Sequence, residues 1–134
     1  MAKTKQLTVW LRSAPGQIGQ ITQALGDAQV NISAFSCSTR AGDSPLRLQV
    51  SDYERAREIL QGLGLRLTEE EVLRVTVAHK PGAAARIGQA LGAAGINIDY
   101  AYGAVAPGAR KAELVFGVSD LSGALRVLKP LKLG

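Results

Sequence analysis

The chain has 134 residues, of which 46% are hydrophobic and 20% charged, and its formal net charge is +5. No run approaches the roughly 18 apolar residues of a membrane-spanning helix, and a single cysteine, Cys37, excludes an intrachain disulfide. One cysteine and one histidine cannot supply the three or four ligands of a usual zinc site, so we expect no metal and no cofactor. We expect a reducing, cytoplasmic location.

The first half of the chain opens with strand-forming sequence at residues 7–11, which Pro15-Gly16 interrupts. Apolar residues at helical spacing then predict a helix with Ile18, Ile21, Leu25 and Ala28 on its buried face. The remaining elements expected in this half are strands over 31–39 and 46–50, a helix over 53–60 after an N-cap at Asp52, and a short strand at 63–67.

The second half repeats these steps. It predicts strands over 73–78, 96–105 and 112–118, helices over 84–94 and 121–128, and a last short strand at Leu131 and Leu133. Between the halves, Thr68-Glu69-Glu70-Glu71 is short and acidic and predicts a tight linker. The domains expected are therefore residues 1–68 and 69–134.

The two halves are copies of one ancestral unit. When residues 9–32 are read against residues 75–98 without gaps, eleven of twenty-four positions are identical, including Pro15/Pro81, Gly16/Gly82 and Asn31/Asn97. Each half has the element order strand–helix–strand–strand–helix–strand. The predicted fold class is therefore α+β: two ferredoxin-like βαββαβ units, each with an antiparallel four-stranded sheet and both helices on one face.

Two short segments in each copy resemble the ACT domain. They are a strand followed by Pro-Gly opening a helix, at 13–18 and 79–82, and an Asn-Ile pair that begins the next strand, at 30–32 and 96–98. The resemblance spans nearly all of residues 6–133 and implies a stand-alone tandem ACT protein. ACT domains bind small regulators, most often amino acids, at interfaces between paired domains, and they allosterically regulate enzymes of amino-acid metabolism.

By that resemblance, the loop at 13–17 pairs with Asn97 and the loop at 79–83 pairs with Asn31. Many family members have Asp or Asn two residues before the Pro, where this chain has Ser13 and His79. The candidate ligand-binding residues are Ser13, Ala14, Pro15, Gly16, Gln17, Ile18, His79, Lys80, Gly82 and Ala83 from the loops, and Asn31, Ile32, Asn97, Ile98 and Asp99 from the strands.

The residue types at these positions suit an amino acid. The first turn of a helix leaves N–H groups without intrahelical partners, and these groups and the helix dipole favour a carboxylate. The side-chain carbonyl of Asn31 or Asn97 can accept from an ammonium group. Asp99 stands where the first copy has Ser33 and would strengthen ammonium binding, so the sequence favours the site formed by the loop at 13–17 and Asn97.

Other functions are open at this point. The first alternative is a structural or protein-interaction module that regulates a partner enzyme without a ligand of its own, and a minor alternative is nucleic-acid binding, which the basic charge permits. No nucleophile–base arrangement or phosphate-binding loop occurs, so we do not expect an enzyme. Units this small are expected to pair as a homodimer. The sequence does not indicate which amino acid binds.

Overall fold

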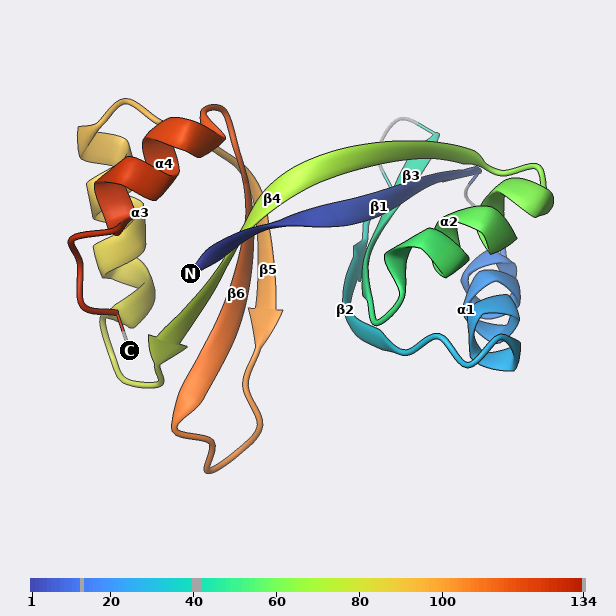
Figure 1. The fold of residues 1–134 in the computed structure, drawn as a ribbon, viewed down its shortest axis with the longest axis horizontal. Coiled ribbons are helices and arrows are strands. Elements are labelled where there is room, and N and C mark those ends of the chain that lie inside the picture. Colours follow the sequence, from blue (N-terminus) through green and yellow to red (C-terminus); the bar gives the residue numbers. More distant parts are fainter. Residues whose placement is uncertain (13, 40–41, 134) are drawn as a thin grey trace. The chain divides into compact units, whose positions relative to one another are not determined.

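The computed structural model describes residues 1–12, 14–39 and 42–133 (Figure 1). Within these residues, antiparallel strands follow one another in the sheet order β2-β3-β1-β4-β6-β5, and four helices accompany them. This confirms the predicted α+β fold class. The described helices include none long and apolar enough to cross a membrane. The elements are β1 (Ala2–Arg12), α1 (Gln17–Asp27), β2 (Ile32–Cys37), β3 (Asp43–Val50), α2 (Tyr53–Gly62), β4 (Arg66–Ala78), α3 (Ala83–Ala93), β5 (Ile98–Ala104), β6 (Lys111–Val118) and α4 (Leu121–Leu128).

The chain divides into two compact units, and both long strands contribute to each of them. One unit comprises Lys5–Glu70, and the other comprises Met1–Thr4 together with Glu71–Gly134. The boundary expected between residues 68 and 69 lies inside β4, close to this division.

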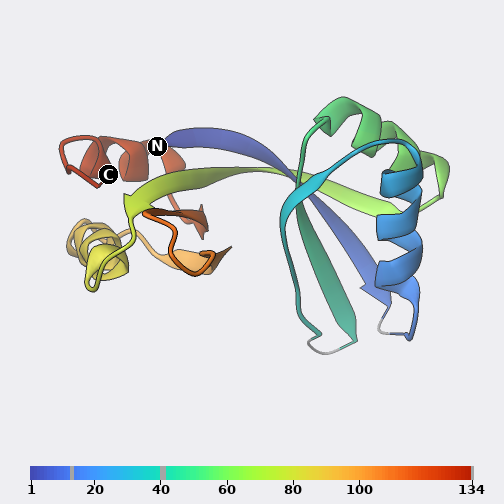
Figure 2. The ribbon, with the colours of Figure 1, turned by 90° about the horizontal axis from the view of Figure 1, so that it is seen from below.

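In the unit of residues 5–70, β2 pairs with β3 and β3 pairs with β1, and α1 and α2 cover one face of these strands (Figures 1 and 2). Alternation along β1 directs every second side chain into the core, because successive residues of a strand point to opposite faces. The buried apolar residues of this unit are Leu7, Val9, Leu11, Ile21, Leu25, Val30, Leu46, Leu48, Ala56 and Leu60.

In the unit of residues 71–134, β4 pairs with β6 and β6 with β5, and α3 and α4 lie together on one face of the strands (Figure 1). The duplication extends to a strand irregularity, since the register shifts between Ile98 and Tyr100 just as it does between Ile32 and Ala34. The buried apolar cluster consists of Leu73, Val75, Val77, Ile87, Leu91, Ile96, Ala112, Phe116, Ala124 and Leu128.

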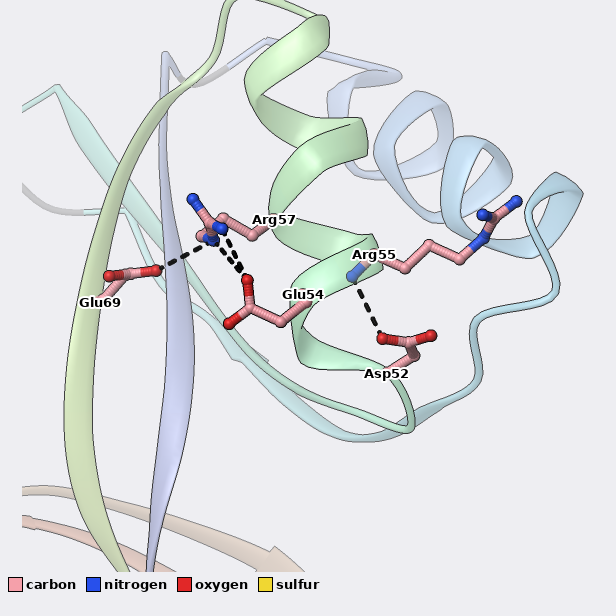
Figure 3. Close-up of polar contacts among 5 residues, drawn as sticks. All are labelled: Asp52, Glu54, Arg55, Arg57 and Glu69. Carbon is pink, nitrogen blue, oxygen red and sulfur yellow. Dashed lines mark hydrogen bonds and ion pairs between the residues drawn. The ribbon is translucent and has the colours of Figure 1, made fainter.

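The predicted linker at 68–71 is wrong, because these residues are strand within β4. Their acidic side chains find partners on other elements. Thr8 Oγ1 donates to Glu70 at 2.8 Å, Lys3 forms an ion pair with Glu71 at 3.4 Å, and Arg57 of α2 lies 3.5 Å from Glu69 (Figure 3). These contacts allow a run of glutamates to occupy a strand.

The predicted strand at Leu131 and Leu133 is also wrong. Both leucines pack against the core, but among residues 129–133 the backbone forms no strand. The backbone N–H of Ala78 donates to the carbonyl of Leu133 at 2.7 Å, and Arg86 donates to the carbonyl of Lys132 at 2.7 Å. The alternation of leucines therefore predicted their packing against the core, where both are partly buried, but it wrongly predicted a ladder of strand hydrogen bonds.

The ion pairs of α2 surround a half-buried tyrosine. Arg57 bridges Glu54 and Glu69, as Figure 3 shows, and the ammonium of Lys5 lies 5.4 Å from the ring centre of Tyr53. Burial, and secondly the carboxylate of Glu69, raise the pKa of the Tyr53 hydroxyl above its ordinary value of about 10. This tyrosine therefore keeps its proton in the folded chain at a pH where the unfolded chain releases it.

We expect alkaline pH to destabilise the chain through Tyr53. Below about pH 10 both states hold the proton, whereas above it the unfolded state binds fewer protons, so the free energy of unfolding falls as pH rises. Tyr53→Phe should make that fall shallower. Urea unfolding of both chains between pH 8 and 11 measures the effect, and parallel curves across that range would contradict it.

Candidate functional site

The helices α1 and α3 begin without a side-chain cap. Each follows a left-handed glycine, Gly16 at φ 87° and Gly82 at φ 88°, and among the described residues no side chain accepts a hydrogen bond from either first turn. The other two helices are capped conventionally, since Asp52 accepts from the N–H of Arg55 and Asp120 accepts from the N–H of Gly123. In the part of the chain that the structure describes, the helices without a side-chain acceptor are thus those that follow the duplicated Pro-Gly segments.

Backbone hydrogen bonds shape the loop at 79–83. The N–H of His79 donates to the carbonyl of Arg110 at 2.8 Å, and the N–H of Lys80 donates to the carbonyl of Ala78 at 2.9 Å. The N–H of Ala83 donates to the carbonyl of Lys80 at 3.2 Å. A positive φ at Gly82 completes the turn, a conformation that glycine adopts without steric cost.

The paired asparagines use their backbones in the same way in both copies. The N–H of Asn31 donates to Ser51 Oγ at 2.9 Å, and that of Asn97 donates to Ser119 Oγ at 3.0 Å. Each asparagine carbonyl accepts in return from the N–H of the same serine. Since these contacts involve only backbone atoms of the asparagines, they do not account for the asparagine side chain.

Their side chains differ between the copies. Asn97 Nδ2 donates to Asp99 Oδ1 at 2.8 Å, and both residues are exposed. Ser33, which stands in the first copy where the second copy has Asp99, donates instead to the backbone carbonyl of Gln49 at 3.2 Å. Asn97 thereby directs its amide group toward Asp99 and keeps its carbonyl oxygen as an acceptor, next to a carboxylate.

The predicted loop residues lie at the surface. Ala14, Pro15 and Gly16 are exposed, and Ile18 is 39% exposed rather than buried, while Ser13 lies outside the described residues. Gln17 is half-buried, and its side-chain oxygen is buried without a hydrogen-bond partner among the described residues.

Within the unit of residues 71–134, the loop at 79–83 and Asn97 lie far apart. The end of β5, at Gly103 and Ala104, lies beside His79, whereas Asn97 precedes the start of that strand. Gly103 lies six residues after Asn97 along an extended strand, which corresponds to about 20 Å. The predicted pairing of each loop with the asparagine of the other copy stays a prediction.

A pocket of about 240 Å³ lies beside the loop at 79–83. Its walls come from the end of β4, the first turn of α3, the end of β5 and the first half of β6. Eleven residues line it: Val77, Ala78, His79, Lys80, Ala83, Ala84, Gly103, Ala104, Val105, Ala112 and Leu114.

Family comparison identifies the fold. The family described as ACT domain pair matches residues 2–132. The chain belongs to this family. A search of curated proteins gave no match.

Several solved structures resemble this ACT domain pair along its length. Protein BT0572 from Bacteroides thetaiotaomicron is 27% identical with a TM-score of 0.88, over 96% of this chain and 88% of that protein. The ligand-free regulatory subunit of aspartate kinase from Thermus thermophilus is 16% identical with a TM-score of 0.69, over 97% of both chains. The corresponding subunit from Thermus flavus is 16% identical with a TM-score of 0.63, over 96% of this chain and 94% of that one.

Sequence reasoning about this ACT domain pair found the loop but missed most of the pocket. Most of the missed residues are on β4, β5 and β6, where Gly103 and Ala112 leave space that larger residues would fill, and the others are Ala84 of α3 and Val105 just after β5. Their small size was visible in the sequence, but their convergence depends on the β5–β6 register, which pairs Gly103 with Leu114. Among the described residues, no group of three or more His, Cys, Asp or Glu is placed to hold a metal, and Cys37 is an exposed free thiol.

Proposed function

We propose that this ACT domain pair is a non-catalytic regulatory protein that binds an amino acid at its Pro-Gly loops, with a second ACT-like unit, of the same chain or of another copy, completing the site. The observation that carries the proposal is the contrast among the four helix starts. Those of α2 and α4 have an aspartate acceptor, whereas those of α1 and α3 follow a left-handed glycine and have no side-chain acceptor among residues 1–12, 14–39 and 42–133. A ligand carboxylate supplies the missing acceptor.

Besides its carboxylate, an amino acid carries an ammonium group, which needs hydrogen-bond acceptors. The carbonyl oxygen of Asn97 and the carboxylate of Asp99 offer two neighbouring acceptors, because Asn97 Nδ2 donates to Asp99 Oδ1 at 2.8 Å and holds the two side chains together. Asn31 offers one, without a neighbouring carboxylate. The Asn97 end of β5 is therefore the stronger candidate for binding the ammonium group.

The regulated partner we propose is an enzyme of amino-acid metabolism, and the assembly a homodimer. Two of the structural relatives are described as regulatory subunits of aspartate kinase, and they share the whole fold of this chain. Occupancy of the loops would favour one arrangement of the ACT-like units and so alter the partner, because a ligand shifts a conformational equilibrium by its difference in affinity for the two states.

Thermal unfolding of the full chain with each common L-amino acid at millimolar concentration tests the proposal. A ligand at one hundred times its Kd stabilises the native state by about 2.7 kcal/mol, which gives a shift of several degrees in Tm. Asn97→Ala should abolish or strongly reduce that shift, and Asn31→Ala should reduce it less. If no amino acid shifts the Tm, the proposed amino-acid binding is wrong. If Asn97→Ala binds like the unaltered chain, the proposed role of Asn97 is wrong.

A second candidate function is a protein-interaction module without a ligand. Phe35 is 57% exposed on β2, which is the terminal strand of the sheet order. A terminal strand offers unpaired backbone groups to another chain, and an exposed aromatic side chain adds apolar contact area. A chain that forms stable dimers and shows no amino-acid-dependent Tm shift would favour this alternative.

A further inference from the structure

Basic residues gather at one end of the unit of residues 71–134, where β4 ends and α3 begins. Backbone contacts bring their segments together, since the N–H of His79 donates to the carbonyl of Arg110 and the N–H of Ala78 donates to the carbonyl of Leu133. Ala78 is also the register partner of Lys111, and Figure 1 shows the C-terminal segment beside the end of β4. The residues of this cluster, which we name the basic end, are Lys80, Arg86, Arg110, Lys111 and Lys132.

No carboxylate balances the basic end. All of its residues are exposed, and none forms an ion pair within residues 1–12, 14–39 and 42–133. The four acidic side chains of this unit each have a partner elsewhere, in the pairs Lys3–Glu71, Arg74–Glu113, Asn97–Asp99 and Gly123–Asp120. Because like charges gathered without counter-charges attract an anion, the basic end favours a negatively charged partner.

The first copy does not share this cluster. The residues at the equivalent positions are Ala14, Gln20, Gly42, Asp43 and Gly64. Asp43 is the register partner of Arg12, so opposite charges face each other across β1 and β3, whereas Ala78 faces Lys111 in the second copy. The fold that the two copies share therefore does not require the basic end.

An apolar pocket adjoins the basic end. The pocket of about 240 Å³ includes Lys80 in its lining, and its largest apolar side chains are Val77, Val105 and Leu114. Such a lining favours a hydrocarbon group. Nucleic acids offer phosphates but no aliphatic side chain, and none of the residues of the basic end is an aromatic on which a base would stack. The two features together fit an acidic protein segment better than a nucleic acid.

We propose that the basic end and this pocket form a docking surface for an acidic segment of a protein partner, with carboxylates of the segment at the cations and one aliphatic side chain in the pocket. A side chain within a peptide carries no ammonium group, so it needs no acceptor from the lining. The volume is below the roughly 300–1,000 Å³ of pockets for drug-sized ligands, which suits a single side chain. The inference goes beyond the proposed function, since this docking requires no bound amino acid.

Fluorescence anisotropy of labelled peptides with the full chain tests the inference. The probe is the amidated peptide Glu-Glu-Glu-Leu-Glu-Glu-Glu, at about 50 mM NaCl so that charges are weakly screened. Replacing its leucine by serine should weaken binding at least about ten-fold, because a leucine side chain loses its burial. Replacing its glutamates by lysines should abolish binding.

Variants of the chain locate the contact. Lys111→Asp and Arg86→Gln introduce the residues of the first copy, and Lys111→Asp should weaken binding of the leucine peptide about three-fold or more. Arg12→Asp makes the same change in net charge at the equivalent end of the other unit, and should leave the affinity within about two-fold. Circular dichroism should show these variants folded, since the first copy folds with Asp and Gln at the two positions.

Several results would overturn the inference. If the leucine peptide does not bind, or binds no better than the serine peptide, the pocket does not receive a partner's side chain. If Arg12→Asp weakens binding as much as Lys111→Asp, the attraction belongs to the net charge of the chain and not to the basic end. If a short DNA duplex or a single-stranded RNA binds more tightly than the leucine peptide at the same salt concentration, the surface binds phosphates. The amino-acid-dependent Tm shift is measured without peptide, so the two proposals fail separately.

Discussion

Replacing Leu91 by alanine should lower the free energy of unfolding by about 2–5 kcal/mol, the range measured for truncating a leucine in a protein core. Leu91 is 0% exposed and lies on the buried face of α3, in the core of the unit of residues 71–134. Truncation removes buried methyl groups and leaves a cavity that closely packed neighbours only partly fill. Urea or thermal unfolding followed by circular dichroism measures the loss.

The duplication supplies a matched test of the same effect. Leu25 holds the equivalent position in α1 and is also 0% exposed, so Leu25→Ala should cost a similar amount in the unit of residues 5–70. Gln89→Ala, on the exposed side of α3, should change stability by no more than about 0.5 kcal/mol. A loss below about 1 kcal/mol for Leu91→Ala would contradict the packing described for this helix.

Helical periodicity predicted the central turns of these helices better than their first turns. Ile21, Leu25, Ile87 and Leu91 are buried as their spacing indicates, but Ile18 and Ala84 belong to the same apolar faces and are exposed. Ala84 lines the pocket, at the open end of the core. Periodicity indicates which side of a helix faces the sheet but not where along the helix the core ends.

Contacts between distant segments explain the errors along β4. The three consecutive glutamates predicted a tight linker, because the local sequence shows only their charge. Their partners, Lys3, Thr8 and Arg57, come from β1 and α2 and became visible only in the structure. Likewise, Met1–Thr4 belongs to the compact unit of Glu71–Gly134, an association that no local pattern encodes.

The candidate site was predictable where it depends on backbone conformation and hidden where it depends on strand register. Pro-Gly before an apolar helix predicted both loops, and both glycines have the positive φ that such a turn requires. The pocket, in contrast, needs β5 and β6 aligned so that small residues from both strands meet below α3. A change of register by one residue would send those side chains to the opposite face.

The register of β5 and β6 also leads to the second large expected effect, which is the loss of stability on substituting Gly117. This glycine pairs with Tyr100 across β5 and β6, and a Cβ at position 117 would overlap the Tyr100 ring. We expect Gly117→Ala to lower the free energy of unfolding by about 1–3 kcal/mol, the usual cost of forcing an extra group into a packed site. As a control, Gly92→Ala adds a Cβ that meets no atom within 4 Å apart from its chain neighbours and the nearby backbone of its own helix, and should stabilise α3 by about 0.5–1 kcal/mol.

A double-mutant cycle tests whether the Tyr100 ring causes the loss of stability in Gly117→Ala. The first copy has Ala34 opposite Gln49 at the equivalent pair, so a side chain is tolerated on β3 where the facing residue is small. In the Tyr100→Ala background, Gly117→Ala should therefore be neutral or stabilising, giving a coupling of at least about 1 kcal/mol between the two positions. If the two substitutions add without coupling, steric overlap with the ring is not the reason that glycine occupies position 117.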